Sequence, residues 1–561
     1  MNKIWKIKDQ NSQLQHHLSD VLSVPPVIAQ LLINRGITDI KEAEQFLYAG
    51  LDHLHDPFLI KDMDVAVKRI KQAQAEKEIV LIFGDYDVDG VTSSAMLHNI
   101  LTQMEIDVIN HIPHRMEDGY GLNHEVAQFA KEKNVGLLIT VDCGITSYDE
   151  VETIKGLGMD VIIIDHHEPA RNRIPKALAV INPKQADCQY PFRDLASVGL
   201  VAKLIQALVG AVKEEVLQMA ALGTIADVAP LRGENRVFVK TGLPNIHQTK
   251  NIGLRALIEV AKINGKKITP YHIGFILGPR INAAGRMDTA HTSLELFLSK
   301  NDQDAQLLAK ALDRHNTDRQ KLQRTVIQEA LEIIDQEVNF NEQKVIVLSK
   351  EGWHKGVLGI VASRITDKYY RPSVVISIKD GVGVASARSI DGFHLHDALA
   401  DCSQYLEEFG GHEGAAGLTI KEKNIDMFRE LINSIAQRTL EINKLVPSIQ
   451  IDCEIAVSSI NMELAQVINS MEPFGEANPP PVFCSRRLMV KGVPRILAKE
   501  TLKLWVTDGQ CSISAVGFGM AAYVDMVVPG QPVDLVYEIA IDDWNKEPTP
   551  QLKLKDIRPS L

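Results

Sequence analysis

The chain has 561 residues, of which 45% are hydrophobic and 24% charged, the balance of an ordinary globular protein. This length predicts three or four domains, and the composition excludes a fibrous repeat and wholesale disorder. With 60 basic and 72 acidic residues the net charge is −12, which argues against a protein that coats nucleic acid by bulk electrostatics. A local basic groove, or acidic residues gathered around cations, is compatible with that charge.

The sequence gives no sign of a membrane or a secreted protein. No apolar run reaches the roughly 18 residues that span a bilayer, and the first ten residues, MNKIWKIKDQ, lack the apolar core of a signal peptide. The six cysteines are scattered without a CxxC pair, which predicts free thiols rather than a disulfide frame or a zinc knuckle. We therefore expect a cytoplasmic protein without membrane partners.

The first part of the chain predicts an α/β domain after a short helical segment. Residues 1–60 are polar and are expected to be helical, and residues 61–300 alternate between strand-like and helix-like segments. The apolar runs of strand length lie at 78–84, 135–141, 160–165 and 178–182. This alternation predicts a mostly parallel sheet covered by helices on both faces, with ligands bound at the carboxyl ends of its strands.

The second part predicts three further pieces. Residues 301–340 are expected to form a long connecting helix, because apolar residues recur at helical spacing and neither Gly nor Pro occurs in 301–337. A second α/β domain should occupy 341–440, beginning with the apolar run at 344–349. The alternating runs and turns of 441–561 predict a small β-barrel.

Three aspartates follow the first predicted strand at a spacing of two residues: Asp85, Asp87 and Asp89. Carboxylates this close repel one another unless cations neutralise them. An EF-hand loop is excluded, because Met96 stands where its bidentate Glu would be. The segment alone is equally compatible with a metal site and with an acidic turn that caps the next helix.

Further ligand-type residues follow the other strands. His166 and His167 come after Asp165, Asp142 follows another strand, and Asp227 stands near a predicted helix end. Taken singly, the histidines could be exposed loop residues, and Asp227 could be a charge at a helix end. Together with the three aspartates they form an oxygen-rich set with a minority of nitrogen, which suits Mn²⁺ or Mg²⁺. Two such ions, about 3.5–4 Å apart around a bridging carboxylate, would serve phosphoester hydrolysis.

The ordered motifs DYDVDG, VDCG, DHH and GTIADVAPL resemble those of the DHH phosphoesterases, which are named for the Asp-His-His. GPRINAAGR (278–286) and GGHEGAAG (410–417) are similar to the RecJ branch, the second within its DHHA1 domain. The resemblance covers roughly 70–420, with a weaker likeness to the branch's C-terminal OB-fold. It implies a single-stranded-DNA-specific 5′→3′ exonuclease of DNA repair and recombination that uses two Mn²⁺ or Mg²⁺ ions.

The resemblance also implies roles for the acidic and histidine residues. Many DHH enzymes carry a His where this chain has Phe83, a departure for which Asp85 is expected to compensate, as a ligand or as a partner of one. His167 should face the scissile phosphate, and Asp142 should be both ligand and catalytic residue. The expected metal ligands are Asp85, Asp87, Asp89, Asp142, His166 and Asp227.

Substrate-binding residues are expected outside the acidic set. Ser386 and Arg388 project to the same side of a predicted strand and would clamp a terminal 5′-phosphate. A glycine-rich turn would bring backbone amides and His412 to a phosphate. Surface ion pairs or packing between domains would also account for such residues. The remaining residues that the resemblance or the polar stretch assigns to the substrate are Arg115, Arg280, Asn282 and Arg286.

The C-terminal segment carries a basic stripe, which we define as Arg486, Arg487, Lys491, Arg495, Lys499 and Lys503. Phe483 and Trp505 flank the stripe, either as stacking platforms for bases or as barrel core. Basic side chains on a small barrel are typical of sequence-independent binding to a single strand.

Two other functions compete with the exonuclease. One is a DHH phosphodiesterase that cleaves oligoribonucleotides or cyclic dinucleotides, and the residues after Leu418 with their basic stripe argue against it. The other is a DNA-binding relative that has lost its metals, although every core position is still Asp or His. The family role further implies a single-strand-binding protein and a helicase as partners, and we expect a monomer.

Overall fold

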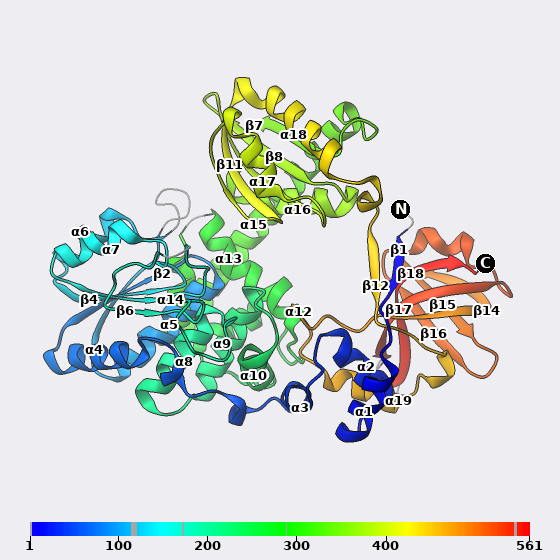
Figure 1. The fold of residues 1–561 in the computed structure, drawn as a ribbon, viewed down its shortest axis with the longest axis horizontal. Helices are drawn as coiled ribbons and strands as arrows, with labels where there is room; N and C mark the ends of the chain where they lie inside the picture. The colour runs from blue at the N-terminus through cyan, green and yellow to red at the C-terminus, as the bar shows by residue number, and fades with distance from the viewer. Residues whose placement is uncertain (1–2, 114–120, 171–172, 288, 543–546, 561) are drawn as a thin grey trace. The chain divides into compact units, whose positions relative to one another are not determined.

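The computed structural model describes residues 3–113, 121–170, 173–287, 289–542 and 547–560 (Figure 1). The chain divides into two compact units, which are described separately. The smaller unit contains Leu312–Ile449 together with Met1–Ile4 and Arg286–Asp288. The larger unit consists of Trp5–Gly285, Thr289–Ala311 and Gln450–Leu561.

The segment expected to be helical begins with a short strand, β1 (Ile4–Ile7), before its helices. Its helices and the one that follows them are α1 (Ser12–Leu22), α2 (Pro26–Asn34), α3 (Ile40–Tyr48) and α4 (Met63–Glu76). Pro26 is the first residue of α2, where its missing N–H costs no helical hydrogen bond. The strand pairs with β12 (Ser448–Ile451).

The larger unit contains a five-stranded parallel sheet, as the apolar runs predicted (Figure 1). Its order is β3-β2-β4-β5-β6, with strands β2 (Ile79–Gly84), β3 (Asp107–His111), β4 (Val135–Val141), β5 (Asp160–Ile164) and β6 (Ala179–Ile181). The edge strand β3 was not anticipated, because none of its residues is fully buried and it therefore lacks an apolar run.

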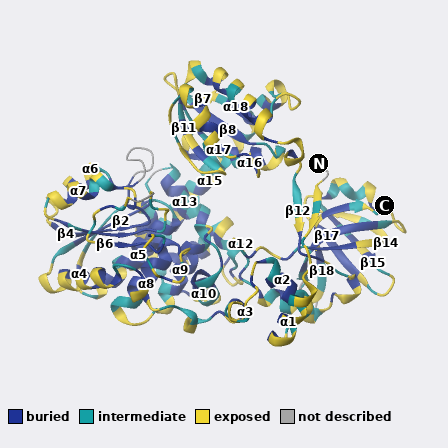
Figure 2. Cartoon of the chain, in the orientation of Figure 1, coloured by how far each residue is buried: buried dark blue, intermediate teal, exposed yellow. Residues whose placement is uncertain are grey.

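Helices cover both faces of this sheet, as expected for its near-continuous apolar strands (Figures 1 and 2). One face carries α6 (His124–Glu132) and α7 (Tyr148–Gly156). The other carries α4, α5 (Val88–Gln103) and α8 (Ser197–Val209), and α9 (Glu214–Ala226) packs on α5 and α8. Buried side chains concentrate in the strands and in α5, α8 and α9, so this layer forms a rigid base for the loops at the carboxyl edge (Figure 2).

Further helices follow α9 in the chain. They are α10 (Gly233–Gly242), α11 (Ile252–Val260), α12 (Pro270–His272), a π-helical turn at Ile273–Leu277, α13 (Gly278–Met287), α14 (His291–Leu298) and α15 (Asp302–Glu337). The 36-residue helix α15 occupies the stretch in which a long helix was expected. In the part of the chain that the structure describes, no helix is long and apolar enough to cross a membrane.

The smaller unit contains a five-stranded sheet of order β10-β11-β9-β8-β7. Its elements are β7 (Ile346–Glu351), α16 (Leu358–Tyr369), β8 (Ser373–Lys379), β9 (Val382–Arg388), α17 (Leu395–Asp401), β10 (Leu406–Gly411), β11 (Ala415–Lys421) and α18 (Ile425–Thr439). Only the β7–β8 pair is parallel among the described strands of this sheet.

The C-terminal part forms the expected closed barrel. Its elements are β13 (Cys453–Glu454), α19 (Met462–Ser470), β14 (Phe483–Leu497), β15 (Thr501–Thr507), β16 (Ser512–Gly517), β17 (Pro532–Asp542) and β18 (Thr549–Pro559). The long strand β14 pairs with β15 at one end and with β17 at the other, and this second pairing closes five strands into a barrel.

A buried arginine connects the helical layer of the larger unit to its barrel segment. The Arg236 side chain in α10 donates to the carbonyl of Phe46 and, beyond α19, to those of Met471, Glu472 and Pro473, at 2.7–3.3 Å. We call this set the carbonyl clasp. Burial lowers the pKa of Arg236 to about 9, so the side chain remains charged at neutral pH. The carbonyls of Met471 and Pro473 also accept the Asn478 side-chain amide, each at 2.9 Å, so Arg236 and Asn478 together satisfy the buried carbonyls of this turn.

Candidate metal centre

The loop after β2 folds back tightly on the start of α5. The Asp87 carboxylate caps this helix by accepting the backbone N–H groups of Asp89 and Gly90, at 2.8 and 3.1 Å. Gly90 permits the close approach, because a Cβ there would lie 2.4 Å from the carbonyl oxygen of Asp85. Asp87 therefore caps α5, as one of the two alternatives predicted. It also lies among the possible metal ligands.

Asp89 is fully buried in the first turn of α5. Its two carboxylate oxygens accept the N–H groups of Ser197 and Val198, each at 2.8 Å, at the start of α8. Burial raises the pKa of Asp89 well above its usual value, and the charges of Asp227 and Asp87 raise it further. A cation would remove this penalty by pairing with the crowded carboxylates.

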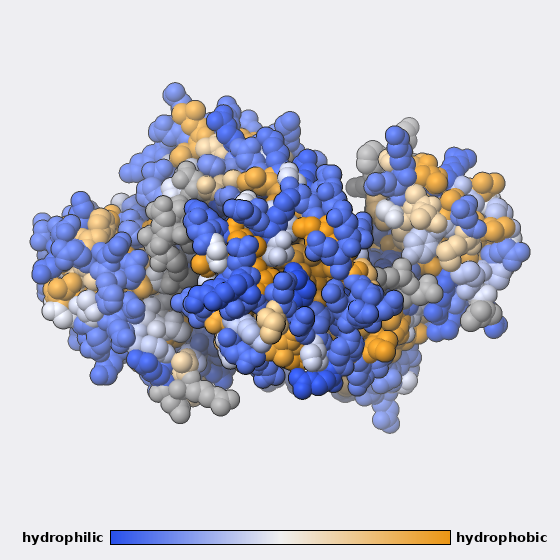
Figure 3. Space-filling model, turned by 90° about the horizontal axis from the view of Figure 1, so that it is seen from above, coloured by the Kyte–Doolittle hydropathy of each residue, from blue (hydrophilic) through white to orange (hydrophobic). Residues whose placement is uncertain are grey.

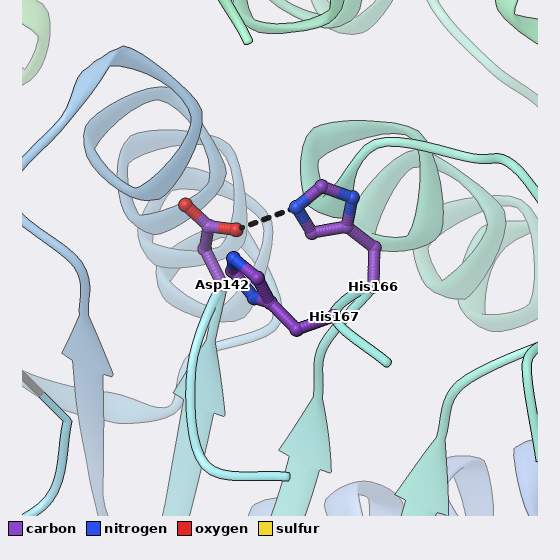
Figure 4. Close-up of side chains that lie close together, drawn as sticks. All are labelled: Asp142, His166 and His167. Carbon is purple, nitrogen blue, oxygen red and sulfur yellow. Dashed lines mark ion pairs between the residues drawn. The ribbon is translucent and has the colours of Figure 1, made fainter. Parts of the chain in front are cut away.

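Asp142 lies directly after the end of β4, close to His166. Its backbone is in the left-handed region, with φ of 64°, and its N–H donates to the carbonyl of Ile164 at 2.9 Å. Its Oδ1 lies 3.4 Å from Nε2 of His166 (Figure 4). The same Nε2 lies 3.8 Å from Oδ2 of Asp227. Burial, followed by the charges of the neighbouring aspartates, raises the pKa of Asp142 strongly.

The two histidines differ in protonation. Burial and the neighbouring His167 lower the pKa of His166 to about 4, so its ring is neutral at pH 7 and can offer a lone pair. Burial also disfavours charge on His167, but the hydrogen bond from its Nδ1 to Asp165, at 2.7 Å, outweighs burial and raises its pKa. His167 is therefore the histidine more able to carry a proton.

Asp165 holds His167 in place, a position in the centre that was not predicted from the sequence. One of its oxygens accepts the N–H of Ile145 at 2.9 Å, and the other accepts the N–H of His167 at 3.0 Å in addition to the ring contact. Burial opposes its charge, but the bonds from His167 outweigh burial and lower the pKa of Asp165. The signal was available in the sequence, as the acidic residue directly before the histidine pair.

Possible ligand atoms form three overlapping groups, each lying within 4.8 Å. The groups are Asp85 with Asp87 and Asp142, Asp89 with His166 and Asp227, and Asp142 with His166 and His167. Asp142 belongs to two groups, as a bridging ligand would. Carboxylate oxygens predominate over imidazole nitrogens, a donor set that fits Mn²⁺ or Mg²⁺. All six residues expected as ligands lie here, and their coordination of metal stays a prediction.

Phe83, at the position of the usual His, offers no ligand atom. Its ring is fully buried and stacks on that of His111, with centroids 5.6 Å apart. Asp85 lies one residue beyond the end of the same strand, in one group with Asp87 and Asp142. The geometry is compatible with compensation by Asp85.

Three of the residues expected at the substrate, Arg280, Asn282 and Arg286, lie on α13. This helix approaches the loop after β2. A Cβ on Gly285 of this helix would lie 3.1 Å from the carbonyl oxygen of Tyr86. Arg280 donates to the carbonyl of Ile276 at 2.7 Å, and Asn282 is half-buried with its Oδ1 unpaired within the described residues. Arg286 belongs to the smaller unit, where it donates to the carbonyl of Gly356 at 3.2 Å.

The expected phosphate clamp lies at one end of the sheet in the smaller unit. Arg388 donates to Ser386 Oγ at 3.4 Å, and it pairs across strands with Ala415, next to the turn that contains the exposed His412. Gly359 leaves room beside the clamp, because a Cβ there would lie 3.1 Å from Ser386 Oγ and 3.2 Å from Arg388 Nη2. Arg115, the remaining residue of the expected set, lies outside the described residues.

The basic stripe follows the β14–β15 hairpin, and the structure separates its two aromatic neighbours. Lys491 lies opposite Trp505, whose side chain is 49% exposed, and Arg495 lies opposite Lys503. Phe483 is fully buried in the barrel, so the core alternative holds for this residue. The face of the molecule seen in Figure 3 is mainly hydrophilic, with smaller separate apolar areas.

Comparisons with known proteins match three segments of the chain. Residues 79–224 match the DHH family, N-terminal domain; residues 342–438 the DHHA1 domain; and residues 451–556 the RecJ OB domain. The chain is 38% identical over 555 residues to the single-stranded-DNA-specific exonuclease RecJ of Bacillus subtilis, which covers 98% of this chain and 70% of that protein.

Solved structures agree with this similarity. The crystal structure of Thermus thermophilus RecJ with Mn²⁺ has a TM-score of 0.85 at 27% identity and covers 100% of this chain and 80% of that one. The corresponding structure with Mg²⁺ has a TM-score of 0.78 at 25% identity and covers 100% of this chain and 79% of that one.

The close packing of the loop after β2 against Gly90 can be tested by substitution. Gly90→Ala should lower the free energy of unfolding by about 1–3 kcal/mol, because its Cβ would collide with the Asp85 backbone. The matched control is Gly156→Ala, at the last residue of α7. Nothing lies within 4 Å of a Cβ there, so the free energy of unfolding should not fall. Denaturant unfolding measures both, and equal stability of the two variants would contradict the close approach.

The shared position of Asp142 generates a second test. Asp142→Asn keeps a side chain that tolerates left-handed backbone but removes a charge, so binding of Mn²⁺ should weaken by at least about tenfold. Without metal the variant should melt at a higher temperature at pH 7, because folding of the wild type must either bury the Asp142 charge or take up a proton, and Asn requires neither. Thermal melting across a Mn²⁺ titration measures both effects, and an unchanged Mn²⁺ response would remove Asp142 from the ligand set.

Proposed function

Because the chain belongs to the RecJ family of single-stranded-DNA-specific exonucleases, we propose that it degrades single-stranded DNA from the 5′ end by hydrolysing phosphodiester bonds. The observation that carries this proposal is the metal centre, in which Asp142 belongs to two groups of ligand atoms at the carboxyl edge of the parallel sheet. The small-substrate and metal-free alternatives have no comparable support, since the chain keeps both the acidic set and the barrel.

The proposed centre holds two Mn²⁺ or Mg²⁺ ions on Asp85, Asp87, Asp89, Asp142, His166 and Asp227. When bound, such ions stabilise the charge that develops on the attacking and leaving oxygens of a phosphodiester. The protein fixes the ligands beforehand: backbone N–H groups orient Asp87 and Asp89, and the left-handed backbone directs Asp142. Little reorganisation is then needed when the substrate arrives.

His167 is proposed to act on the scissile phosphate. Asp165 fixes the ring through Nδ1, which leaves Nε2 to donate to a phosphate oxygen when the imidazole is charged. The raised pKa of His167 favours this charged form. Asp142 is the second proposed catalytic residue, through its position between the ligand groups.

Substrate recognition is proposed to involve residues of both units. Ser386, Arg388 and His412 would bind the terminal 5′-phosphate, with support from the strand register and from the room that Gly359 leaves. The basic stripe would bind the DNA backbone, with Trp505 as a stacking platform for a base. The other residues proposed to contact the strand are Arg115, Arg280, Asn282 and Arg286.

We propose that the chain is organised into five segments. They are the N-terminal segment 1–60, the DHH catalytic domain 61–300, the connecting helix 301–340, the DHHA1 domain 341–440 and the OB domain 441–561. The three family matches and the closed barrel support the last two domains and the catalytic one.

The cellular role that follows is DNA repair and recombination in the cytoplasm, as a monomer beside a single-strand-binding protein and a helicase. The free state of all six cysteines fits a reducing compartment. A strict single-strand substrate requires a partner that unwinds duplex DNA, which is the reason for proposing the helicase.

The test uses the full chain with Mn²⁺ and a single-stranded oligonucleotide labelled at its 3′ end. Progressive shortening from the 5′ end, with a duplex left intact, is the expected result. Cleavage of a labelled dinucleotide alone would favour the small-substrate alternative. Binding of the single strand without cleavage would favour the metal-free alternative.

The phosphate clamp generates a separate prediction. Arg388→Ala should reduce kcat/KM by about tenfold or more on strands with a 5′-phosphate, because a charge-assisted contact is lost. Strands with a 5′-hydroxyl should be affected much less. Arg438→Ala, at an exposed position of α18, is the control and should leave both rates unchanged. An equal loss on both substrates would contradict the clamp.

A further inference from the structure

Val228, the residue after Asp227, has a backbone conformation that its side chain disfavours. Its φ is 61°, in the left-handed region. Among the described non-glycine residues with positive φ, Val228 is the only β-branched one. A bulky β-branched residue in this region is a true outlier, and such strain persists only where the surrounding structure enforces it.

The strain arises from the way α9 ends. The N–H of Val228 donates to the carbonyl of Ile225, and that of Ala229 to the carbonyl of Thr224, each at 3.2 Å. This is the pattern of a Schellman motif, whose left-handed position is usually Gly or Asn. The sequence therefore keeps valine where glycine would relieve the strain.

Packing within the protein does not account for the valine. Its side chain is 63% exposed, so it gains little from burial in the fold. The other strained residue of the centre, Asp142, directs a possible ligand, whereas Val228 has no ligand atom to offer. An apolar side chain held exposed at a strained position indicates contact with something outside the chain.

The contact is inferred from the place of Val228 directly after Asp227, a possible ligand of the metal centre. Asp227 Oδ2 lies 3.8 Å from His166 Nε2, and the Cα of Val228 follows that of Asp227 by about 3.8 Å. A DNA strand whose phosphate lies among these ligands must place a sugar and a base beside it. The base is the apolar part of a nucleotide, and its face suits an isopropyl group.

We propose that Val228 is held in this strained conformation so that its side chain packs against the base of the nucleotide being released. The inference rests on the proposed function and adds a substrate-contacting residue to it. The contact involves no hydrogen bond to a base edge, so it favours an unpaired base over an abasic end without selecting among sequences.

The test compares Val228→Asn with Lys262→Asn. Lys262 occupies the same position in a second Schellman motif, at the end of α11: its φ is 57°, and the N–H of the next residue, Ile263, donates to Ile258 at 3.3 Å. Asn tolerates left-handed backbone, so neither variant should melt below the wild type. Only Val228→Asn should lower kcat/KM on single-stranded DNA, by about tenfold for the loss of two methyl contacts.

A substrate whose 5′-terminal nucleotide lacks its base distinguishes the contact from an effect on Asp227. With this substrate the difference between wild type and Val228→Asn should disappear, and the Mn²⁺ concentration for half-maximal activity should be the same for both. A tenfold loss that persists on the abasic substrate, a shifted Mn²⁺ requirement, or unchanged kcat/KM would each overturn the inference. Wild-type protein that cleaves no single strand would instead overturn the proposed function, and this inference with it.

Discussion

The mutual repulsion of carboxylates at the carboxyl edge of one parallel sheet is the constraint on which this structure depends. Burial raises the pKa of Asp89, Asp142 and Asp227, the last to about 7, and the charges of neighbouring aspartates raise all three further. Such a set persists only where backbone donors and helix starts hold it in place. The loop after β2 and the start of α8 supply those donors, and the buried helical layer holds both of them rigid.

Most of this arrangement could be predicted from the sequence, because it follows from periodicity. The apolar runs that became β2, β4, β5 and β6 are buried on both faces, and parallel strands of this kind end at a common edge. The acidic and histidine residues directly after those runs could therefore be expected to lie close together. The barrel could be anticipated in the same way, from alternating residues and turns, although its closure by the β14–β17 pairing could not.

What escaped prediction depends on contacts between distant segments. The N–H groups of Ser197 and Val198 bind Asp89 from more than a hundred positions away in the chain. Every residue type except proline has a backbone N–H, so the sequence does not indicate which of them will be donors. Phe83 is a different case. The sequence shows that it departs from the family pattern, but not that its ring is part of the core. The edge strand β3 lacks a buried run, so periodicity had nothing to detect.

The carbonyl clasp makes the protein and its complexes respond differently to ionic strength. Arg236 is buried and its described partners are neutral carbonyls, so dissolved ions have little access to these bonds. Contacts between the basic stripe and DNA phosphates would behave in the opposite way, because binding there releases condensed counterions. Rising salt would thus free the nucleic acid while the barrel segment stays attached to α10. Arg236 therefore holds the protein together at any ionic strength, whereas the basic stripe would bind nucleic acid in a salt-dependent way.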